Sequence, residues 1–335
     1  MVSSTPRPLA GSHLGETQPR RFQEESGKMI CMAVTDTSGV SFPGETPATR
    51  PRGNKPATRL RALLTLCRPL NCVITVASAG VGGLTGNTDP LAAALCAAAL
   101  SAGLITAAGN TFNDRIDIDI DRINRPARPL PAGLISPVAA SFMAALLSLT
   151  GLVLALLVSR IHAIVALLVV ATLILYSLRL KRTPLWGNLA VASMAAVVFP
   201  YGAMAAGTFG RSWIPAGLAF LFHVGREIIK DIEDITGDRA GRAGTLPVRC
   251  GTAAARWWAT VVLLVLVVFT ALPAVLGTYG AGYALPVSAL NVLVLSVLWQ
   301  LHRQPGAVQD GRLGRQLKAG MLLGLAAVVA GEVSR

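Results

Sequence analysis

The chain has 335 residues, of which 53% are apolar and only 14% are charged. An ordinary soluble domain carries about 25% charged residues, so this composition excludes that class and favours a protein embedded in a membrane. The five cysteines have no paired spacing, and the chain has no CxxC or HExxH motif. Neither a disulfide framework nor a zinc site is therefore supported.

Two regions of different composition divide the chain. Residues 1–58 are rich in Ser, Thr, Pro, Gly and Arg and lack sustained apolar periodicity, which predicts a disordered basic tail. Residues 59–335 contain apolar runs close to the length of about 20 residues that a bilayer-spanning helix needs. The nine expected spans are residues 69–86, 90–112, 136–158, 161–178, 185–208, 213–230, 256–277, 281–301 and 316–333. Because no useful stretch alternates as a strand does, we expect an all-α polytopic membrane protein with nine transmembrane helices around a central cavity.

The basic residues mark one side of the membrane. If the N-terminus is cytoplasmic, all but three of the 30 lysines and arginines fall on the cytoplasmic side, and the exceptions are Arg160, Arg211 and Arg335. This positive-inside bias predicts a multi-pass protein of the cell membrane. Its N-terminus and the loops at residues 114–135, 179–182, 226–256 and 303–318, which include the active-site loops, are then cytoplasmic. The net charge of +13 is then a signal for topology and anionic lipid, and nucleic acid is not an expected partner.

Carboxylates gather in two short segments, residues 113–121 and 227–238, at the cytoplasmic ends of the second and sixth expected spans. On a helical wheel Asn113, Asp117 and Asp121 line one stripe, with Asp114 beside it and Asp119 on another face. In the second segment the residues that share one face are Glu227, Asp231, Asp234 and Asp238, while Glu233 lies off it.

Like charges at these spacings repel, so a positive group should compensate them. Clustered oxygen ligands suit Mg²⁺, which is commonly held by a few carboxylates together with substrate phosphates. Two facing Asp-rich stripes therefore predict a Mg²⁺ cluster that binds a diphosphate and makes it a leaving group. Nearby cations that could contact phosphate are Arg122, Arg125, Arg128, Arg179, Lys181, Arg226 and Lys230. Two alternatives are solvated loops and a cation transporter, although pathway carboxylates should lie in mid-span.

These motifs resemble the UbiA superfamily of intramembrane prenyltransferases over about residues 60–335. The family pattern NDxxDxxxD matches Asn113, Asp114, Asp117 and Asp121, and its second DxxxD motif matches Asp234 and Asp238, with Asp231 upstream. A turn after the fourth span, with Tyr176 and Lys181, is also similar.

The resemblance implies a nine-helix membrane fold and Mg²⁺-dependent capture of a polyprenyl diphosphate between the two motifs. It implies metal binding by Asn113, Asp114, Asp117, Asp121, Asp231, Asp234 and Asp238, among which Asp117, Asp121, Asp234 and Asp238 are the expected catalytic residues. Expected substrate contacts are Asn113, Arg122, Tyr176, Lys181 and Lys230.

Two stretches concern the acceptor. Residues 121–133 resemble the DxINRPxRPxPxG pattern of geranylgeranylglycerol-phosphate geranylgeranyltransferases, and residues 226–238 are similar to their REIxKDIEDxxGD segment. This likeness implies transfer of a geranylgeranyl group from geranylgeranyl diphosphate to the hydroxyl of geranylgeranylglyceryl phosphate, the second ether bond of archaeal-type lipids. Chlorophyll synthases and homogentisate prenyltransferases share the first stretch loosely. An aromatic acceptor of the 4-hydroxybenzoate, homogentisate, naphthoate or chlorophyllide type is therefore the alternative.

A glycerol phosphate acceptor needs a cationic anchor for its phosphate, and a base can take the proton of its hydroxyl. The arginines of residues 122–128 could anchor its phosphate, or could bind lipid headgroups instead. His223 lies one turn before Glu227 on the same face and could serve as the base, or as a packing residue.

Overall fold

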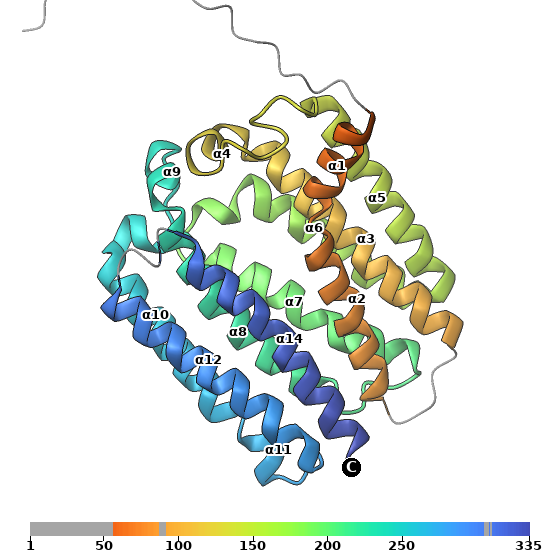
Figure 1. Cartoon of the computed structure of the whole chain (residues 1–335). Helices are drawn as coiled ribbons and strands as arrows, with labels where there is room; N and C mark the ends of the chain where they lie inside the picture. The colour runs from red at the N-terminus through yellow and green to blue at the C-terminus, as the bar shows by residue number, and fades with distance from the viewer. Residues whose placement is uncertain (1–55, 87–91, 305–307, 309) are drawn as a thin grey trace, which may run out of the picture. The chain divides into compact units, whose positions relative to one another are not determined.

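The computed structural model describes residues 56–86, 92–304, 308 and 310–335, and these residues form helices without a strand among them (Figure 1). This confirms the all-α prediction. The predicted tail lies outside the described residues up to residue 55, so its disorder stays a prediction. The long helices are α2 (Pro69–Leu84), α3 (Ala92–Ile116), α5 (Pro137–Val158), α6 (Arg160–Leu178), α7 (Trp186–Ala205), α8 (Trp213–Glu233), α10 (Leu246–Phe269), α12 (Ala284–Arg303) and α14 (Arg312–Val333). The short ones are α1 (Pro56–Cys67), α4 (Ile118–Asn124), η1 (Leu180–Arg182), α9 (Ile235–Ala240), α11 (Leu272–Val275) and η2 (Ala281–Tyr283).

The apolar helices make this a multi-pass membrane protein. Seven segments of the described chain are long and apolar enough to cross a bilayer, and the bent pair α1 and α2, which meet at 44°, would be an eighth. Helix α8 coincides with the sixth expected span but is not among them, because Arg226, Glu227 and Lys230 occupy its C-terminal half. The expected count of nine spans is therefore not confirmed, although a helix overlaps each of the nine ranges.

Local signals explain where several helices begin. The Ser136 hydroxyl accepts a hydrogen bond from the backbone N–H of Ala139, and Pro137 follows it at the first helical position of α5. Ser159 caps α6 in the same way, through the N–H of His162. These caps satisfy backbone donors that a helix start leaves unpaired.

Two helices that lead to the Asp-rich segments break in the same way. Helix α3 gives way to α4 at Asp117 (φ −90°, ψ 9°), and α8 gives way to α9 at Asp234 (φ −90°, ψ 1°). Helices α4 and α9 pack against each other at one end of the helical assembly (Figure 1). Each Asp-rich segment therefore sits at a helix break, and the two breaks face one another.

Helix α2 passes very close to α7 because both helices carry glycine at the crossing. A Cβ atom built on Gly82 would lie 2.0 Å from the carbonyl oxygen of Phe199. One built on Gly202 would lie 1.8 Å from that of Ala79. Small residues are a common way for membrane helices to approach closely. Helices α2 and α7 both line an internal cavity of the protein, so their crossing sets the distance between two of its walls.

Replacing one of these glycines should separate the two helices. We expect Gly202→Ala to lower the free energy of unfolding by about 1–3 kcal/mol or more, since overpacking of this kind forces backbone shifts. The thermal midpoint of the purified protein in detergent would show this as a clear decrease. Gly217→Ala in α8, where a Cβ would meet nothing within 4 Å, is the control. Equal midpoints for the two variants would contradict the close approach.

Candidate active site

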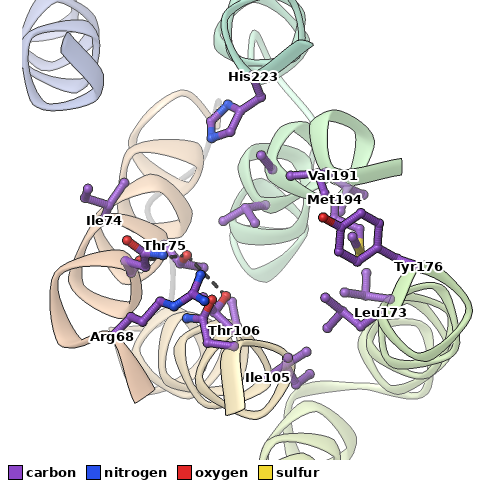
Figure 2. Close-up of a pocket in the computed structure, with 18 of the residues that line it drawn as sticks. Arg68, Ile74, Thr75, Ile105, Thr106, Leu173, Tyr176, Val191, Met194 and His223 are labelled. Atoms are coloured by element: carbon purple, nitrogen blue, oxygen red, sulfur yellow. Dashed lines mark hydrogen bonds between the residues drawn. The ribbon is translucent and has the colours of Figure 1, made fainter. Parts of the chain in front are cut away.

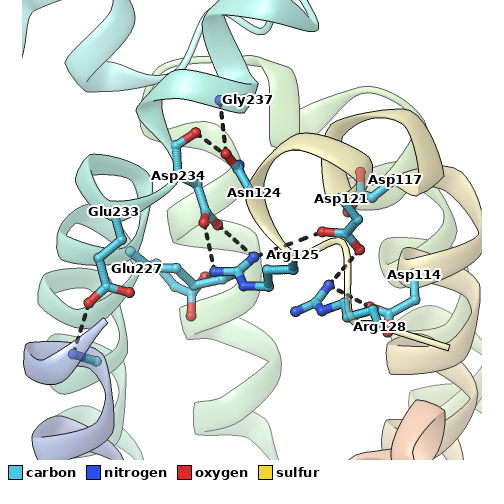
Figure 3. Close-up of polar contacts among 12 residues, drawn as sticks. Asp114, Asp117, Asp121, Asn124, Arg125, Arg128, Glu227, Glu233, Asp234 and Gly237 are labelled. Carbon is cyan, nitrogen blue, oxygen red and sulfur yellow. Dashed lines mark hydrogen bonds and ion pairs between the residues drawn. The ribbon is translucent and has the colours of Figure 1, made fainter. Parts of the chain in front are cut away.

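The two Asp-rich segments meet through one arginine. Arg125, just after α4, donates from both terminal nitrogens to the carboxylate of Asp234, at 2.6 and 3.2 Å. The same guanidinium lies 3.9 Å from a carboxylate oxygen of Asp121 (Figure 3). Burial opposes its charge, but the two Asp residues outweigh that effect and raise the pKa of Arg125. The positive charge that the sequence requires between the stripes is thus supplied by the protein itself.

A side-chain amide makes a second bridge between the segments. Asn124 donates to the backbone carbonyl of Asp234 (3.1 Å), and its Oδ1 accepts from the N–H of Gly237 (3.0 Å). A Cβ at position 237 would lie 2.4 Å from the Asn124 amide nitrogen, so this approach requires glycine. The sequence reasoning did not identify Asn124 as a site residue, although it lies inside the segment that resembles the DxINRPxRPxPxG pattern.

The first segment has the face that the helical wheel predicts. Asp114, Asp117 and Asp121 are 2–4% exposed. The side chain of Asp119 is 89% exposed and pairs with Arg122 at 2.6 Å. The amide of Asn113 donates to Asp117 (2.8 Å), so these two side chains stay aligned across the break in the helix.

Arginines from other parts of the chain neutralise two carboxylates of this buried stripe. Arg128 pairs with Asp121 at 2.6 Å and with Asp114 at 3.1 Å, and Arg68 also pairs with Asp114. Burial raises the pKa of the Asp121 carboxyl, and Arg128 offsets part of that rise. Carboxylates at this depth are costly without such partners.

Lys181, in the turn after α6, pairs with Asp117. Burial alone would lower the pKa of Lys181, but Asp117 and Tyr176 together outweigh burial and the pKa is raised. The turn that holds Tyr176 and Lys181 therefore does reach the first segment. Tyr176 itself is buried at the end of α6.

Two carboxylates of the second segment accept hydrogen bonds from neutral side chains. Asp231 accepts from the amide of Asn188 on α7 (2.8 Å), and Asp238 accepts from the Thr245 hydroxyl (3.0 Å). Burial raises the pKa of Asp238, and the bond from Thr245 opposes that rise. Asn188 and Thr245 were not predicted, because a single polar residue in an apolar or loop sequence carries no spacing signal.

Two acidic residues of the second segment serve other contacts. Glu227 pairs with Arg226 and with Lys230, the latter at 3.0 Å. Glu233 accepts from the backbone N–H of Gly314 at 2.9 Å, which attaches the end of α8 to the first turn of α14. Glu233, which lies off the face shared by the other carboxylates, therefore serves to hold α8 against α14.

A cavity of about 240 Å³ opens beside these carboxylates. Figure 2 shows side chains pointing into it from α2, α3, α6, α7 and α8. Asn113, Glu227 and Lys230 line it together with Tyr176 and His223. The rest of its lining is mainly apolar, as a chamber for a chain with a charged head group requires.

Some of the predicted phosphate contacts lie beside the carboxylates in the structure, and others do not. Lys181 and Lys230 lie with the carboxylates, whereas Arg122 is exposed on the far face of α4 and pairs with Asp119. Arg125 and Arg128, which could anchor an acceptor phosphate or bind lipid headgroups by the sequence alone, pair with carboxylates in the structure. The geometry therefore brings the Asp residues and two lysines together and leaves Arg122 outside.

The donor set fits a hard metal ion. Within the described residues, no three His, Cys, Asp or Glu side chains are grouped closely enough to hold an ion by themselves. However, Oδ1 of Asn113 is buried without a hydrogen-bond partner, beside the carboxylate of Asp117. Mg²⁺ usually binds one or two protein carboxylates and completes its shell with water and substrate phosphates. An unpartnered amide oxygen next to a carboxylate suits that mode.

Comparison with known proteins identifies the family of the chain. The profile of the UbiA prenyltransferase family matches residues 72–319. The chain is 38% identical to the digeranylgeranylglyceryl phosphate synthase of Methanopyrus kandleri, over 81% of this chain and 99% of that protein. It is 38% identical to the Methanoculleus marisnigri synthase, over 79% and 96%.

Solved structures show the same fold. A digeranylgeranylglyceryl phosphate synthase matches with a TM-score of 0.62 and 29% identity, over 83% of this chain and 99% of that one. A UbiA homologue from Archaeoglobus fulgidus, solved with GPP and Mg²⁺, matches with a TM-score of 0.60 and 18% identity, over 80% and 99%.

Removing the amide bridge should loosen the contact between α4 and α9. We expect Asn124→Ala to lower stability by about 1–3 kcal/mol, because it leaves the Gly237 N–H without its partner. Asp119→Ala, an exposed change on the same helix, should leave the thermal midpoint in detergent unchanged. If Asn124→Ala and Asp119→Ala have the same thermal midpoint, the bridge contributes nothing to the packing of the two segments.

Proposed function

We propose a specific reaction for this chain, which belongs to the UbiA prenyltransferase family. It transfers a geranylgeranyl group from geranylgeranyl diphosphate to the free hydroxyl of geranylgeranylglyceryl phosphate. The chain is an enzyme of the prenyltransferase class. The observation that carries the proposal is the pair of Asp-rich helix breaks, joined by Arg125 at the end of an apolar cavity. The names of the relatives, which match nearly along their whole length, support this acceptor.

We assign the metal site to the oxygen donors of the two breaks. Asn113, Asp114, Asp117 and Asp121 would act from the first segment, and Asp231, Asp234 and Asp238 from the second. Mg²⁺, when bound, would neutralise the diphosphate and improve it as a leaving group. The solved Archaeoglobus homologue holds GPP and Mg²⁺ together, which supports this pairing of ligands.

The protein's own cations would share the charge of the diphosphate. Lys181 and Lys230 border the carboxylates at the polar end of the cavity, and each can exchange a carboxylate partner for a phosphate oxygen. Asn113 would orient the diphosphate beside them. The apolar walls would exclude water, which would otherwise capture the allylic cation. The ring of Tyr176 lies in that wall, where its π face can stabilise positive charge.

The proton of the acceptor hydroxyl also needs a destination. Nδ1 of His223 is 2.8 Å from the carbonyl oxygen of Ala219, and because a carbonyl only accepts, this nitrogen carries the proton. Nε2 is then free to accept, and His223 lines the cavity (Figure 2). When the hydroxyl oxygen bonds to the allylic carbon, Nε2 would take up its proton.

The positive-inside bias further supports a cytoplasmic position for the N-terminus and for both Asp-rich segments.

Acceptor preference tests the proposal. Purified protein in liposomes with Mg²⁺ and labelled geranylgeranyl diphosphate should place the label in a diether phospholipid when geranylgeranylglyceryl phosphate is supplied. Parallel reactions would contain 4-hydroxybenzoate in place of that acceptor. Label in the aromatic product alone would overturn the acceptor assignment and keep the prenyltransferase. Chelation with EDTA should abolish either reaction.

Substitutions at the two breaks test the diphosphate site. Asp117→Ala and Asp234→Ala should each reduce kcat by at least about a hundredfold, as expected when charge stabilisation of a leaving group is lost. Asp119→Ala should keep wild-type turnover because its side chain is exposed on another face. Turnover would be measured as label in lipid, and monodisperse elution would confirm folding. Near-normal turnover in either of the first two variants would remove that residue from the site.

A further inference from the structure

A second cavity adjoins the first and has a different chemical character. It has a volume of about 110 Å³ and lies among α2, α7, α8, α12 and α14. Here the cavity beside the carboxylates is called the main cavity and the second one the side cavity. Six residues line both cavities and form the junction between them: Ile74, Thr75, Ala195, Val198, His223 and Met321. Figure 2 shows His223 and Thr75 facing the main cavity at this junction.

The side cavity offers almost nothing to a polar ligand. Its lining, as drawn from the described residues, contains no Asp, Glu, Lys or Arg. The hydroxyls of Ser78, Thr270 and Tyr283 each donate to a backbone carbonyl, at 2.8, 2.6 and 3.0 Å. Away from Nε2 of His223 at the junction, the side cavity therefore holds water poorly and favours an apolar occupant.

We infer that the side cavity binds the first isoprene unit of the acceptor's chain, while the main cavity binds the chain of the diphosphate donor. This inference rests on the proposed function. A reaction between two prenylated substrates requires two apolar sites that converge on one point, and an aromatic acceptor would require one. The two cavities converge at the junction, beside His223.

Charge decides which chain occupies which cavity. The main cavity has Asn113 and Lys230 at its polar end, next to the carboxylates that would receive the diphosphate. The side cavity has no charged wall, so it cannot receive the donor with its diphosphate first. An apolar cavity of roughly 150 Å³ can bind benzene, so the 110 Å³ of the side cavity is on the scale of one isoprene unit and far below that of a whole geranylgeranyl chain. We assign to it the unit next to the ether oxygen, which keeps the free hydroxyl at the junction.

Filling the side cavity from one wall tests this assignment. A Cβ on Gly324 would lie 3.7 Å from a methyl of Leu290, an ordinary contact, so larger side chains at this position project into the cavity. Gly324→Leu should raise KM for geranylgeranylglyceryl phosphate at least about tenfold, the scale on which a pocket discriminates a methylene. KM for geranylgeranyl diphosphate should change less than about twofold. Gly324→Ala should shift the acceptor KM less than Gly324→Leu.

Two further variants make the test specific. Val169→Phe narrows the main cavity and should raise the donor KM while sparing the acceptor KM. Leu322→Ala, at an exposed position on α14, should change neither. An unchanged acceptor KM in Gly324→Leu, or a rise in the donor KM alone, would overturn the inference.

Misfolding and failure of the proposed function remain separable. If both KM values rise in Gly324→Leu, Ala219→Leu fills the same cavity from α8. A selective acceptor effect in that variant supports the inference, and a rise in both KM values overturns it. If the wild-type protein transfers label to geranylgeranylglyceryl phosphate but these variants show no selectivity, only the side-cavity inference fails. If the wild-type protein does not use this acceptor, the proposed function fails and the inference fails with it.

Discussion

The site depends on how buried negative charge is balanced. Three carboxylates between the last turn of α3 and α4 are almost fully buried, and Asp234 faces them from the end of α8. Without compensation their desolvation and mutual repulsion would separate the two helix ends. Arg125, Arg128 and Lys181 supply the compensation, and Arg125 contacts both segments. We propose that the same cations also share their charge with a bound diphosphate.

The matching helix breaks place this charge at the end of an apolar cavity. Because α3 and α8 both break at an aspartate, the following short helices turn toward one another and are joined by Asn124. The close crossing of α2 and α7 at glycines fixes two cavity walls. A charged head group and an apolar chain thus have adjacent but separate surroundings, which is the arrangement that a prenyl diphosphate requires.

Regular spacing accounts for most of what the sequence predicted. Apolar runs indicated the helices, and the four-residue spacing of Asn113, Asp117 and Asp121 indicated one buried face. The count of nine spans was not confirmed, because α8 carries five charged residues in its C-terminal half and is not among the helices apolar enough to cross a bilayer. Helix-wheel reasoning also excluded Asp119, which is exposed as expected.

Contacts between distant segments were beyond the reach of the sequence. Arg68 lies far along the chain from Asp114, and Asn188 from Asp231, so no periodicity links them. Arg122 and Arg125 both follow the first stripe, and only the turn of the chain after α4 shows which one points to Asp234. The polar partners of a site depend on tertiary packing, which pattern alone does not determine.

The central claim is that the two Asp-rich segments bind one diphosphate together. A double-mutant cycle tests it most directly, with the Mg²⁺-dependent affinity for a non-reactive thiolo analogue of geranylgeranyl diphosphate measured for the wild-type protein, Asp117→Ala, Asp234→Ala and the double variant. If both residues act on the same bound group, the double variant should bind scarcely more weakly than either single variant. Fully additive losses of affinity, or a loss confined to one segment, would contradict the account.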